Sequence, residues 1–270
     1  MQGGLQVLIA AAQFEPKPGD FEGNYAKHLK FIDEAASLEA RLILFPELSI
    51  SGYTYDRKIL LSSIDFFRQK RNELIYLSRK YNMAIVGGIP RKILLEIRNS
   101  VFVVRKKKQI LFYDKTHLFR KEKEVFSPGE RFLVFKFNGV RFGILVCYEI
   151  GFPEISRILT LNGAQVLLAP FAFGRERKHI YDIATRARAL ENGAYLVTSS
   201  TSGKGLMNFL GSSRIVGPDG SVLVSARKKE QLIYYDVSVE NLEFFRYIED
   251  GISHAYFLNR KNELYKGLVR

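Results

Sequence analysis

The stretch RFGILVCYEIGFPE at residues 141–154 joins a predicted buried strand to a predicted helix and carries the only cysteine of the chain, Cys147. The apolar run at residues 142–146 is rich in β-compatible side chains, and Gly151 with Pro153 breaks it before a helical pattern begins. Cys147 is therefore expected at the C-terminal end of a strand. In layered α/β folds ligands bind at that edge, and a rigid strand can present a nucleophile there.

Short apolar runs alternate along the whole chain with segments whose apolar residues recur at helical spacing, which predicts an α/β fold. Two βαβ-like halves are expected to contribute their strands to a large sheet system. No low-complexity linker interrupts the chain, so we predict a single domain over residues 1–270. The predicted strands are 5–14, 41–45, 83–86, 99–104, 109–113, 132–137, 142–146, 165–169, 194–199, 211–215, 222–224 and 232–237. The predicted helices are 24–40 with Asn24 as N-cap, 58–81 with a break near residues 68–71, 153–162 and 177–191.

Three of these strands end beside a reactive side chain: Glu47 after Pro46, Lys115, and Cys147. A thiol becomes a good nucleophile when a base or a cation favours its ionisation. A desolvated carboxylate can accept that proton near neutral pH, and an ammonium can stabilise the thiolate and a developing oxyanion. The backbone N–H of Tyr148 could donate a second hydrogen bond to the oxyanion. A lone cysteine in an apolar strand is also typical of an inert core residue, and spacing alone gives only compatible positions.

Several motifs together resemble the nitrilase, or carbon–nitrogen hydrolase, superfamily. They are FPELSISGY at 45–53, VGGIP at 86–90, YDKTHLF at 113–119, EVFSPGE at 124–130, CYEIGFPE at 147–154, RARALENGAYLV at 186–197 and FLGSSRIVGPDG at 209–220. Each motif alone is weak, but all seven occur in the family's order. The resemblance implies a four-layer α-β-β-α sandwich of the nitrilase type.

The resemblance also implies a catalytic triad of Glu47, Lys115 and Cys147, a thioester intermediate, and release of ammonia or an amine. An auxiliary glutamate near the lysine is matched by Glu122, with Glu124 as the competing assignment because the segment RKEKE can be shifted by two residues. Family members need no metal or organic cofactor. They usually form dimers, so we expect a homodimer or a higher homo-oligomer.

Substrate contacts are expected from four aromatic residues: Tyr53, Tyr148, Phe171 and Phe173. The chain departs from small amidases of the family at two places, because Glu149 and Gly151 stand where many of them have Asp and Arg. Absence of that Arg weakens the case for an acidic substrate. True nitrilases usually have Trp after the cysteine, so Tyr148 favours amide hydrolysis. The basic segment 171–181 either shapes the substrate pocket or is a solvated loop.

The charge and the cysteine count of the chain limit which partners and which location are expected. The formal charge is +13 and the isoelectric point is about 9.7, but the basic residues are dispersed. Their densest cluster, residues 105–108, is predicted as a hairpin tip, and no nucleic-acid-binding motif accompanies it. We therefore expect no nucleic-acid partner. A single cysteine excludes an intramolecular disulfide and fits a reducing cytoplasm, the expected location.

Neither end of the chain predicts a membrane segment. Residues 5–12 lack a basic n-region and a cleavage site, so they are interpreted as the first strand, and no apolar run reaches the length that spans a bilayer. Residues 238–270 form an aromatic tail that is expected to pack on the body or on a dimer partner.

The sequence thus predicts a hydrolase that cleaves the carbon–nitrogen bond of a small linear amide. The alternatives are a nitrilase, an N-carbamoyl amide hydrolase, and a glutaminase subunit that supplies ammonia to a synthetase. A non-catalytic binding module is the alternative from a different class.

Overall fold

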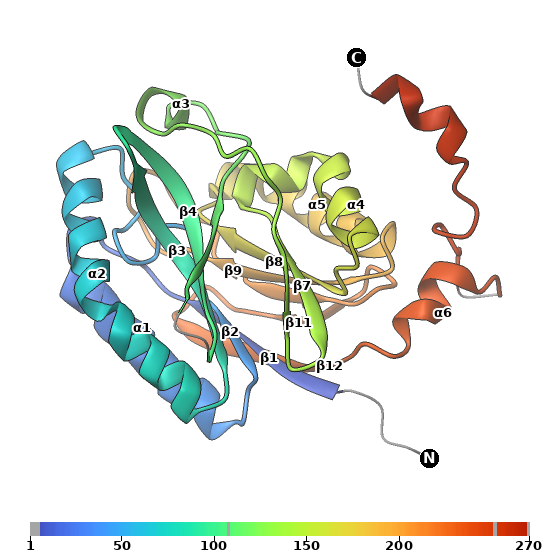
Figure 1. Ribbon diagram of the computed structural model, residues 1–270, viewed down its shortest axis with the longest axis horizontal. Helices are drawn as coiled ribbons and strands as arrows, with labels where there is room; N and C mark the ends of the chain where they lie inside the picture. Colours follow the sequence, from blue (N-terminus) through green and yellow to red (C-terminus); the bar gives the residue numbers. More distant parts are fainter. Residues whose placement is uncertain (1–5, 107–108, 251–252, 269–270) are drawn as a thin grey trace.

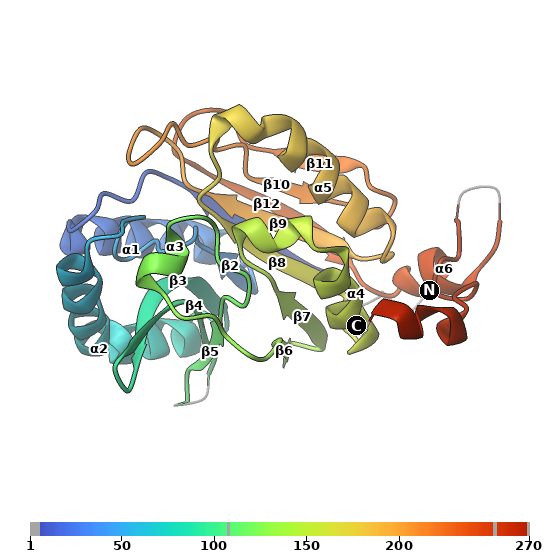
Figure 2. The same ribbon diagram turned by 90° about the horizontal axis from the view of Figure 1, so that it is seen from above.

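The computed structural model describes residues 6–106, 109–250 and 253–268. Two six-stranded sheets face each other, and helices cover their outer sides (Figures 1 and 2). The predicted four-layer α-β-β-α sandwich is confirmed. The main hydrophobic core lies between the sheets and contains side chains of both, such as Ile9 and Leu44 from the first and Ile144 and Leu168 from the second.

The first sheet has the strand order β12-β1-β2-β3-β4-β5. Its inner strands β1, β2 and β3 run parallel, with Ile43 paired to Ala10 on one side and Ile85 on the other. The flanking pairs are antiparallel. The strands are β1 (Gln6–Gln13), β2 (Leu42–Leu44), β3 (Ala84–Ile93), β4 (Glu96–Val104), β5 (Leu111–Asp114) and β12 (Gln231–Ser238).

The second sheet has the order β11-β10-β9-β8-β7-β6. Here β7, β8 and β9 run parallel, and the outer pairs are antiparallel. Each sheet therefore has a parallel centre, whose carboxyl ends are the edge where the predicted site residues emerge. The strands are β6 (Val134–Phe137), β7 (Val140–Ile144), β8 (Val166–Phe171), β9 (Tyr195–Ser200), β10 (Arg214–Val216) and β11 (Val222–Ser225).

Helices α1 (Phe21–Ser37) and α2 (Arg57–Lys80) cover the first sheet, and α4 (Pro153–Leu161) and α5 (Lys178–Leu190) cover the second (Figure 2). Two predictions about the helices are wrong. Asp20, not Asn24, caps α1, because its carboxylate accepts a hydrogen bond of 3.0 Å from the backbone N–H of Gly23. Helix α2 is unbroken, since the charged side chains of Arg68 and Arg71 lie on its exposed face and leave the apolar face continuous.

Strand β3 was expected to end before Gly87, but it continues through Pro90. Its partner β2 ends with Leu44, which lies opposite Val86. Beyond that point the loop after β2 hydrogen-bonds to Gly88 on that side, and β3 continues as a strand paired with β4, where Pro90 lies opposite Asn99. The missing N–H of a proline is tolerated at such an edge, so proline does not end the strand.

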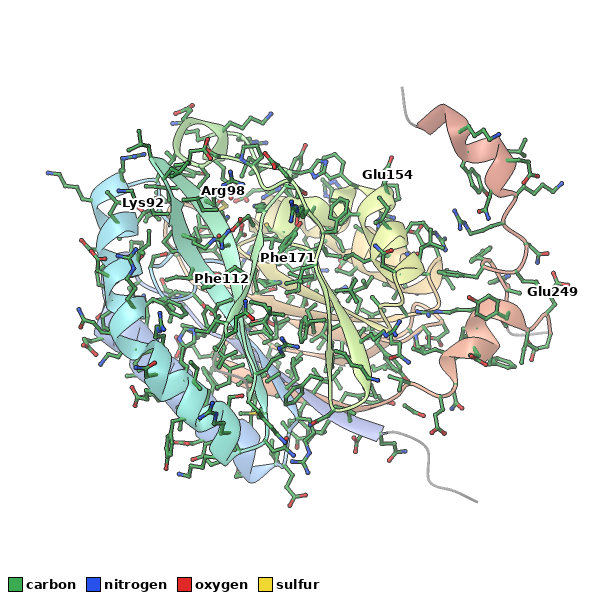
Figure 3. The ribbon with its side chains drawn as sticks, viewed as in Figure 1. Lys92, Arg98, Phe112, Glu154, Phe171 and Glu249 are labelled. Carbon is green, nitrogen blue, oxygen red and sulfur yellow. The ribbon has the colours of Figure 1, made fainter. Side chains whose placement is uncertain are left out.

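The C-terminal segment lies beside α4, outside the sandwich (Figure 1), and contains α6 (Leu242–Tyr247) and a 3₁₀ helix (Asn262–Leu268). The buried Arg246 joins it to the body, because its guanidinium donates hydrogen bonds to the backbone carbonyls of Gly193 (3.0 Å) and Ala164 (2.8 Å). In Figure 3, Glu249 lies on the outer side of this segment, whereas Phe171 lies inside the body. Within the described ranges, no helix has the length and apolar character needed to cross a bilayer.

Candidate active site

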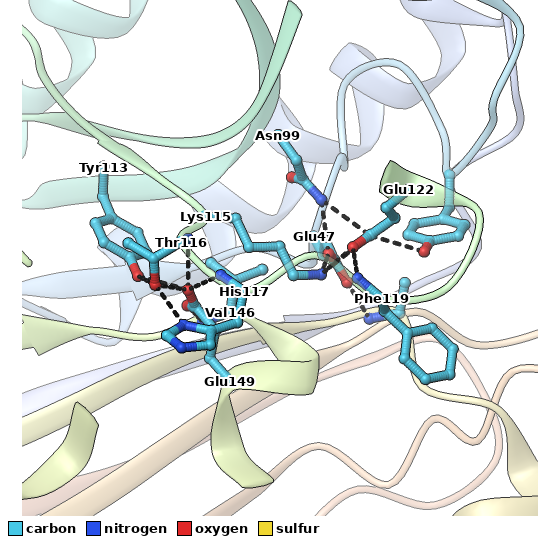
Figure 4. Close-up of polar contacts among 12 residues, drawn as sticks. Glu47, Asn99, Tyr113, Lys115, Thr116, His117, Phe119, Glu122, Val146 and Glu149 are labelled. Atoms are coloured by element: carbon cyan, nitrogen blue, oxygen red, sulfur yellow. Dashed lines mark hydrogen bonds and ion pairs between the residues drawn. The ribbon is translucent and has the colours of Figure 1, made fainter. Parts of the chain in front are cut away.

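Four predicted site residues come from different elements and meet at one edge of the sandwich. Glu47 follows β2, Lys115 follows β5, Cys147 follows β7, and Glu122 begins the short helix α3 (Glu122–Val125). The Nζ atom of Lys115 lies 2.7 Å from Oε1 of Glu47 and 2.9 Å from Oε2 of Glu122 (Figure 4). All three side chains have no exposed surface. One buried ammonium therefore bridges two buried carboxylates.

Cys147 begins a 3₁₀ helix (Cys147–Gly151) that follows directly on the extended residues after β7. Its backbone has φ of 48°, in the left-handed region that is uncommon for residues with a side chain. Such a conformation costs about 1–3 kcal/mol and is maintained only by the surrounding structure. The thiol is nearly buried, with 4% of the residue exposed, and it lies within reach of the charges of Glu47 and Lys115.

Burial sets the protonation of this cluster. It raises the pKa of the Cys147 thiol well above its usual range; the charge of Glu47 adds to this, and that of Lys115 opposes it. Burial also raises the pKa of Glu47, against the opposing charge of Lys115. For Lys115, burial lowers the pKa, but Glu47 and Glu122 outweigh burial and hold the pKa above its ordinary value. The resting site therefore holds a protonated thiol and an ammonium, and the thiol needs a base to become a nucleophile.

Asn99 is a member of this cluster that the sequence analysis missed. Its Nδ2 donates hydrogen bonds to Oε1 of Glu47 (2.8 Å) and of Glu122 (3.3 Å). The hydroxyl of Tyr53, a predicted substrate-binding residue, donates a hydrogen bond of 2.8 Å to Glu122. The sequence carries little signal for Asn99, because the polar residues Arg98 and Ser100 flank it and its burial becomes evident only in the folded structure.

Glu149 forms a second buried polar centre beside the first (Figure 4). Its Oε1 accepts hydrogen bonds from the hydroxyl of Tyr113 (2.8 Å) and from the backbone N–H of Thr116 (2.7 Å). Its Oε2 accepts one from the backbone N–H of Val146 (2.6 Å). The carboxylate thus joins the segment on both sides of Lys115 to the residue directly before Cys147.

Gly88, within the predicted VGGIP motif, allows the backbone that carries Glu47 to approach β3. A Cβ atom at this position would lie 2.0 Å from the backbone nitrogen of Leu48 and 2.7 Å from the carbonyl carbon of Glu47. Neither backbone atom can move without displacing the glutamate. Glycine is therefore required here by a close backbone contact.

The competing glutamates are separated by burial: Glu122 contacts Lys115, whereas Glu124 is exposed. Tyr148 is half-buried, with its ring 5.0 Å from that of Phe119. Phe173 is buried at the start of the loop after β8. Phe171 is buried as well, with its ring 5.4 Å from that of Tyr181, and it has no exposed surface in this structure.

The arrangement is suited to nucleophilic acyl chemistry. The thiol lies within reach of the charges of a buried carboxylate and an ammonium, and the backbone N–H groups of a first helical turn follow it. Across the described residues, no group of His, Cys, Asp and Glu side chains has the arrangement of a metal site.

This fold and these motifs define a carbon–nitrogen hydrolase of the nitrilase superfamily. The model of the carbon–nitrogen hydrolase family matches residues 8–247, so the chain belongs to that family. A probable nitrilase of Schizosaccharomyces pombe is 30% identical over 274 residues, which cover 98% of this chain and 99% of the relative. A nitrilase of Pyrococcus abyssi is 32% identical over 273 residues, covering 96% and 99%.

Among solved structures, an amidase from Nesterenkonia sp. AN1 is similar to this chain. It has a TM-score of 0.85 and 26% sequence identity, and the match covers 99% of this chain and 98% of the amidase. That structure is of a variant in which the acetamide moiety of fluoroacetamide has added covalently at the active site cysteine.

Proposed function

We propose that this protein is an amidase that hydrolyses a small linear amide through a thioester on Cys147. Glu47 is the general base, Lys115 stabilises the oxyanion, and Glu122 holds Lys115 in place. The observation that carries the proposal is the buried ammonium of Lys115, held 2.7 Å from Glu47 beside a thiol whose pKa burial raises. Such a thiol is unreactive alone and acquires a function when a base adjoins it.

In the first half of the reaction, Glu47 takes the proton of the Cys147 thiol while sulfur attacks the amide carbon. The carbonyl oxygen becomes an oxyanion, which the ammonium of Lys115 and the backbone N–H of Tyr148 stabilise. Tyr148 lies in the first turn of its 3₁₀ helix, where backbone N–H groups lack intrahelical acceptors. Glu47 then returns its proton to the leaving nitrogen, the C–N bond breaks, and ammonia leaves the thioester.

In the second half, Glu47 removes a proton from water, and the resulting hydroxide attacks the thioester carbon. The C–S bond breaks, the carboxylic acid forms, and the proton on Glu47 returns to sulfur. Every proton taken up is released within the cycle, so these residues need no external acid or base.

Nitrile hydrolysis is the second candidate, because both of the sequence relatives described above are named as nitrilases. The same thiol could attack a nitrile carbon. Tyr148, in place of the Trp expected directly after the cysteine of true nitrilases, favours the amide. Comparison of butyramide with butyronitrile under identical conditions distinguishes the two, since an amidase turns over the amide at least tenfold faster.

The test is intact-mass spectrometry with ammonia detection on wild type and Cys147→Ala, using short aliphatic amides, glutamine and matched nitriles. We expect an acyl adduct and ammonia release with wild type and neither with the variant. Circular dichroism and thermal unfolding should show that Cys147→Ala is folded. Ammonia release by Cys147→Ala at the wild-type rate would refute the proposal.

A further inference from the structure

A cavity of about 480 Å³ opens beside the candidate active site, between the loops that follow β5, β8 and β9. It is lined by Phe119, Arg120, Gly174, Glu176, Arg177, Leu206, Met207 and Asn208. The mechanism above uses none of these side chains. The cavity therefore offers space for the part of a substrate that lies away from the scissile bond.

Arg177 is the most constrained charged group in this cavity. Its guanidinium carbon lies 4.2 Å from the ring centroid of Phe173 and 4.3 Å from that of Phe119. Two aromatic contacts fix the side chain without neutralising it. Among the described residues, no carboxylate forms an ion pair with Arg177 and no acceptor receives a hydrogen bond from its guanidinium. Its donors are thus pre-positioned for an anion from outside the chain.

Contacts connect this arginine to the reacting groups. The ring of Phe119 lies 5.0 Å from that of Tyr148, the residue directly after the nucleophile. The backbone N–H of Phe119 donates a hydrogen bond of 2.7 Å to Glu122, which in turn contacts Lys115 (Figure 4). Phe173 follows Ala172, whose N–H donates a hydrogen bond of 3.0 Å to Glu47. The rings that hold Arg177 therefore belong to the walls of the candidate active site.

The charges around the cavity favour a single carboxylate. Arg177 and Arg120 contribute two cations, and Arg120 also lies over the ring of Phe119, at 4.8 Å. Arg177 directly precedes α5, whose N-terminus has no side-chain cap, so the helix dipole adds positive potential. The exposed Glu176 is the one acid among the lining residues, and its charge disfavours a dianion such as a phosphate monoester.

From this geometry we propose that Arg177 selects amides that carry a carboxylate at the end remote from the scissile C–N bond. The inference rests on the proposed amidase function and names the substrate class of that site. The guanidinium matches a carboxylate with two parallel N–H···O hydrogen bonds, a geometry that lysine does not provide.

The test uses two amides of similar shape: succinamate, and 4-methylpentanamide, in which an isopropyl group replaces the carboxylate. Wild type should have a kcat/KM for succinamate at least about tenfold higher than for 4-methylpentanamide. Arg177→Gln should lower kcat/KM for succinamate by about 30-fold, mainly through KM, and change the neutral amide less than about threefold. Arg177→Lys should retain part of the selectivity.

Arg175→Gln is the matched control, because Arg175 is an exposed neighbour without a ring contact; it should leave both amides unchanged. Equal efficiency of wild type with both amides would overturn the substrate class and leave the amidase function standing. An equal loss of both activities in Arg177→Gln would also overturn it. Absence of ammonia from both amides would refute the amidase function itself, and this inference with it.

Discussion

The carboxylate of Glu149 lies 2.6 Å from the backbone nitrogen of Val146, so a buried acid holds the residue directly before Cys147. Its other oxygen accepts a hydrogen bond of 2.7 Å from the backbone N–H of Thr116, directly after Lys115. One side chain thereby sets the separation between the thiol and the ammonium.

Glu149→Gln is expected to lower both stability and turnover. In the native protein both carboxylate oxygens of Glu149 accept hydrogen bonds from N–H groups. The glutamine side chain would have to place its NH₂ group at one of these two positions, where it would face another donor. Loss of charge-assisted hydrogen bonds in a buried site should reduce the free energy of unfolding by roughly 2–4 kcal/mol. Urea denaturation and kcat measure the effect, with the exposed Glu154→Gln as control. Wild-type kcat in Glu149→Gln would contradict the positioning role.

Gly88→Ala should displace Glu47 from Lys115. Because the added Cβ would meet the nitrogen of Leu48 at 2.0 Å, the backbone has to move, at a cost of about 3 kcal/mol in the free energy of unfolding. Turnover should fall further than stability explains, because the base is attached to the displaced segment. Gly151→Ala is the control, since no atom lies within 4 Å of a Cβ there. Similar kcat values for the two alanine variants would show that the close approach has no catalytic consequence.

Lys115→Met should abolish turnover and make the free energy of unfolding fall more steeply as pH rises, because the Lys115 charge opposes the burial that raises the pKa of Glu47. The substitution leaves Glu47 and Glu122 buried beside each other with no cation, so one carboxyl retains a proton at neutral pH. A folded-state pKa raised above the unfolded value contributes stability at low pH that is lost as pH rises through the folded pKa. The variant should therefore lose stability relative to wild type between pH 5 and pH 8, as urea denaturation at each pH would measure.

Glu122→Gln combined with Lys115→Met provides the control for that charge repulsion. Removal of one of the two carboxylates should restore most of the stability at pH 8 without restoring turnover. A pH dependence in Lys115→Met equal to that of wild type would argue against carboxylate repulsion as the cause.

His28 should make the protein less stable in mild acid. Burial lowers the pKa of His28 to about 4, although its bond to Asn24 opposes this. Nδ1 lies 2.8 Å from the carbonyl of Asn24 and must donate to it, so Nε2 accepts from the hydroxyl of Ser49 at 3.0 Å. The folded state thus binds fewer protons than the unfolded state, whose His pKa is near 6.5.

The stability contributed by neutral His28 is present above pH 6.5 and is lost as pH falls towards 4, by roughly 3 kcal/mol in all. Urea denaturation at pH 7.5 and pH 5 should show a smaller difference in His28→Gln than in wild type. The same difference in both proteins would assign the acid sensitivity to other groups.

The seven motifs were sufficient to predict the fold, and the ends of apolar runs indicated that Glu47, Lys115 and Cys147 follow strands. That the three side chains meet was implied by the family resemblance, because spacing alone does not bring strand ends together. The sequence did not predict Asn99, since that side chain reaches the site from within a strand and its role depends on sheet pairing. The end of β3 was misplaced for a similar reason. Proline ends a strand only where a neighbouring strand needs a hydrogen bond from its N–H. Strand β2 ends before it reaches the level of Pro90, and this depends on how the sheet is assembled, not on the sequence of β3.

Lys115 forms ion pairs with both Glu47 and Glu122, and the net charge of this buried cluster stays constant while the thiol is activated. When a proton passes from Cys147 to Glu47, a thiolate replaces a carboxylate as the anion beside the same ammonium. The total charge of the cluster does not change, so no counterion has to enter and little of the surrounding medium has to reorganise. Activation of the thiol should consequently be almost insensitive to ionic strength, although the site lies within a protein of formal charge +13.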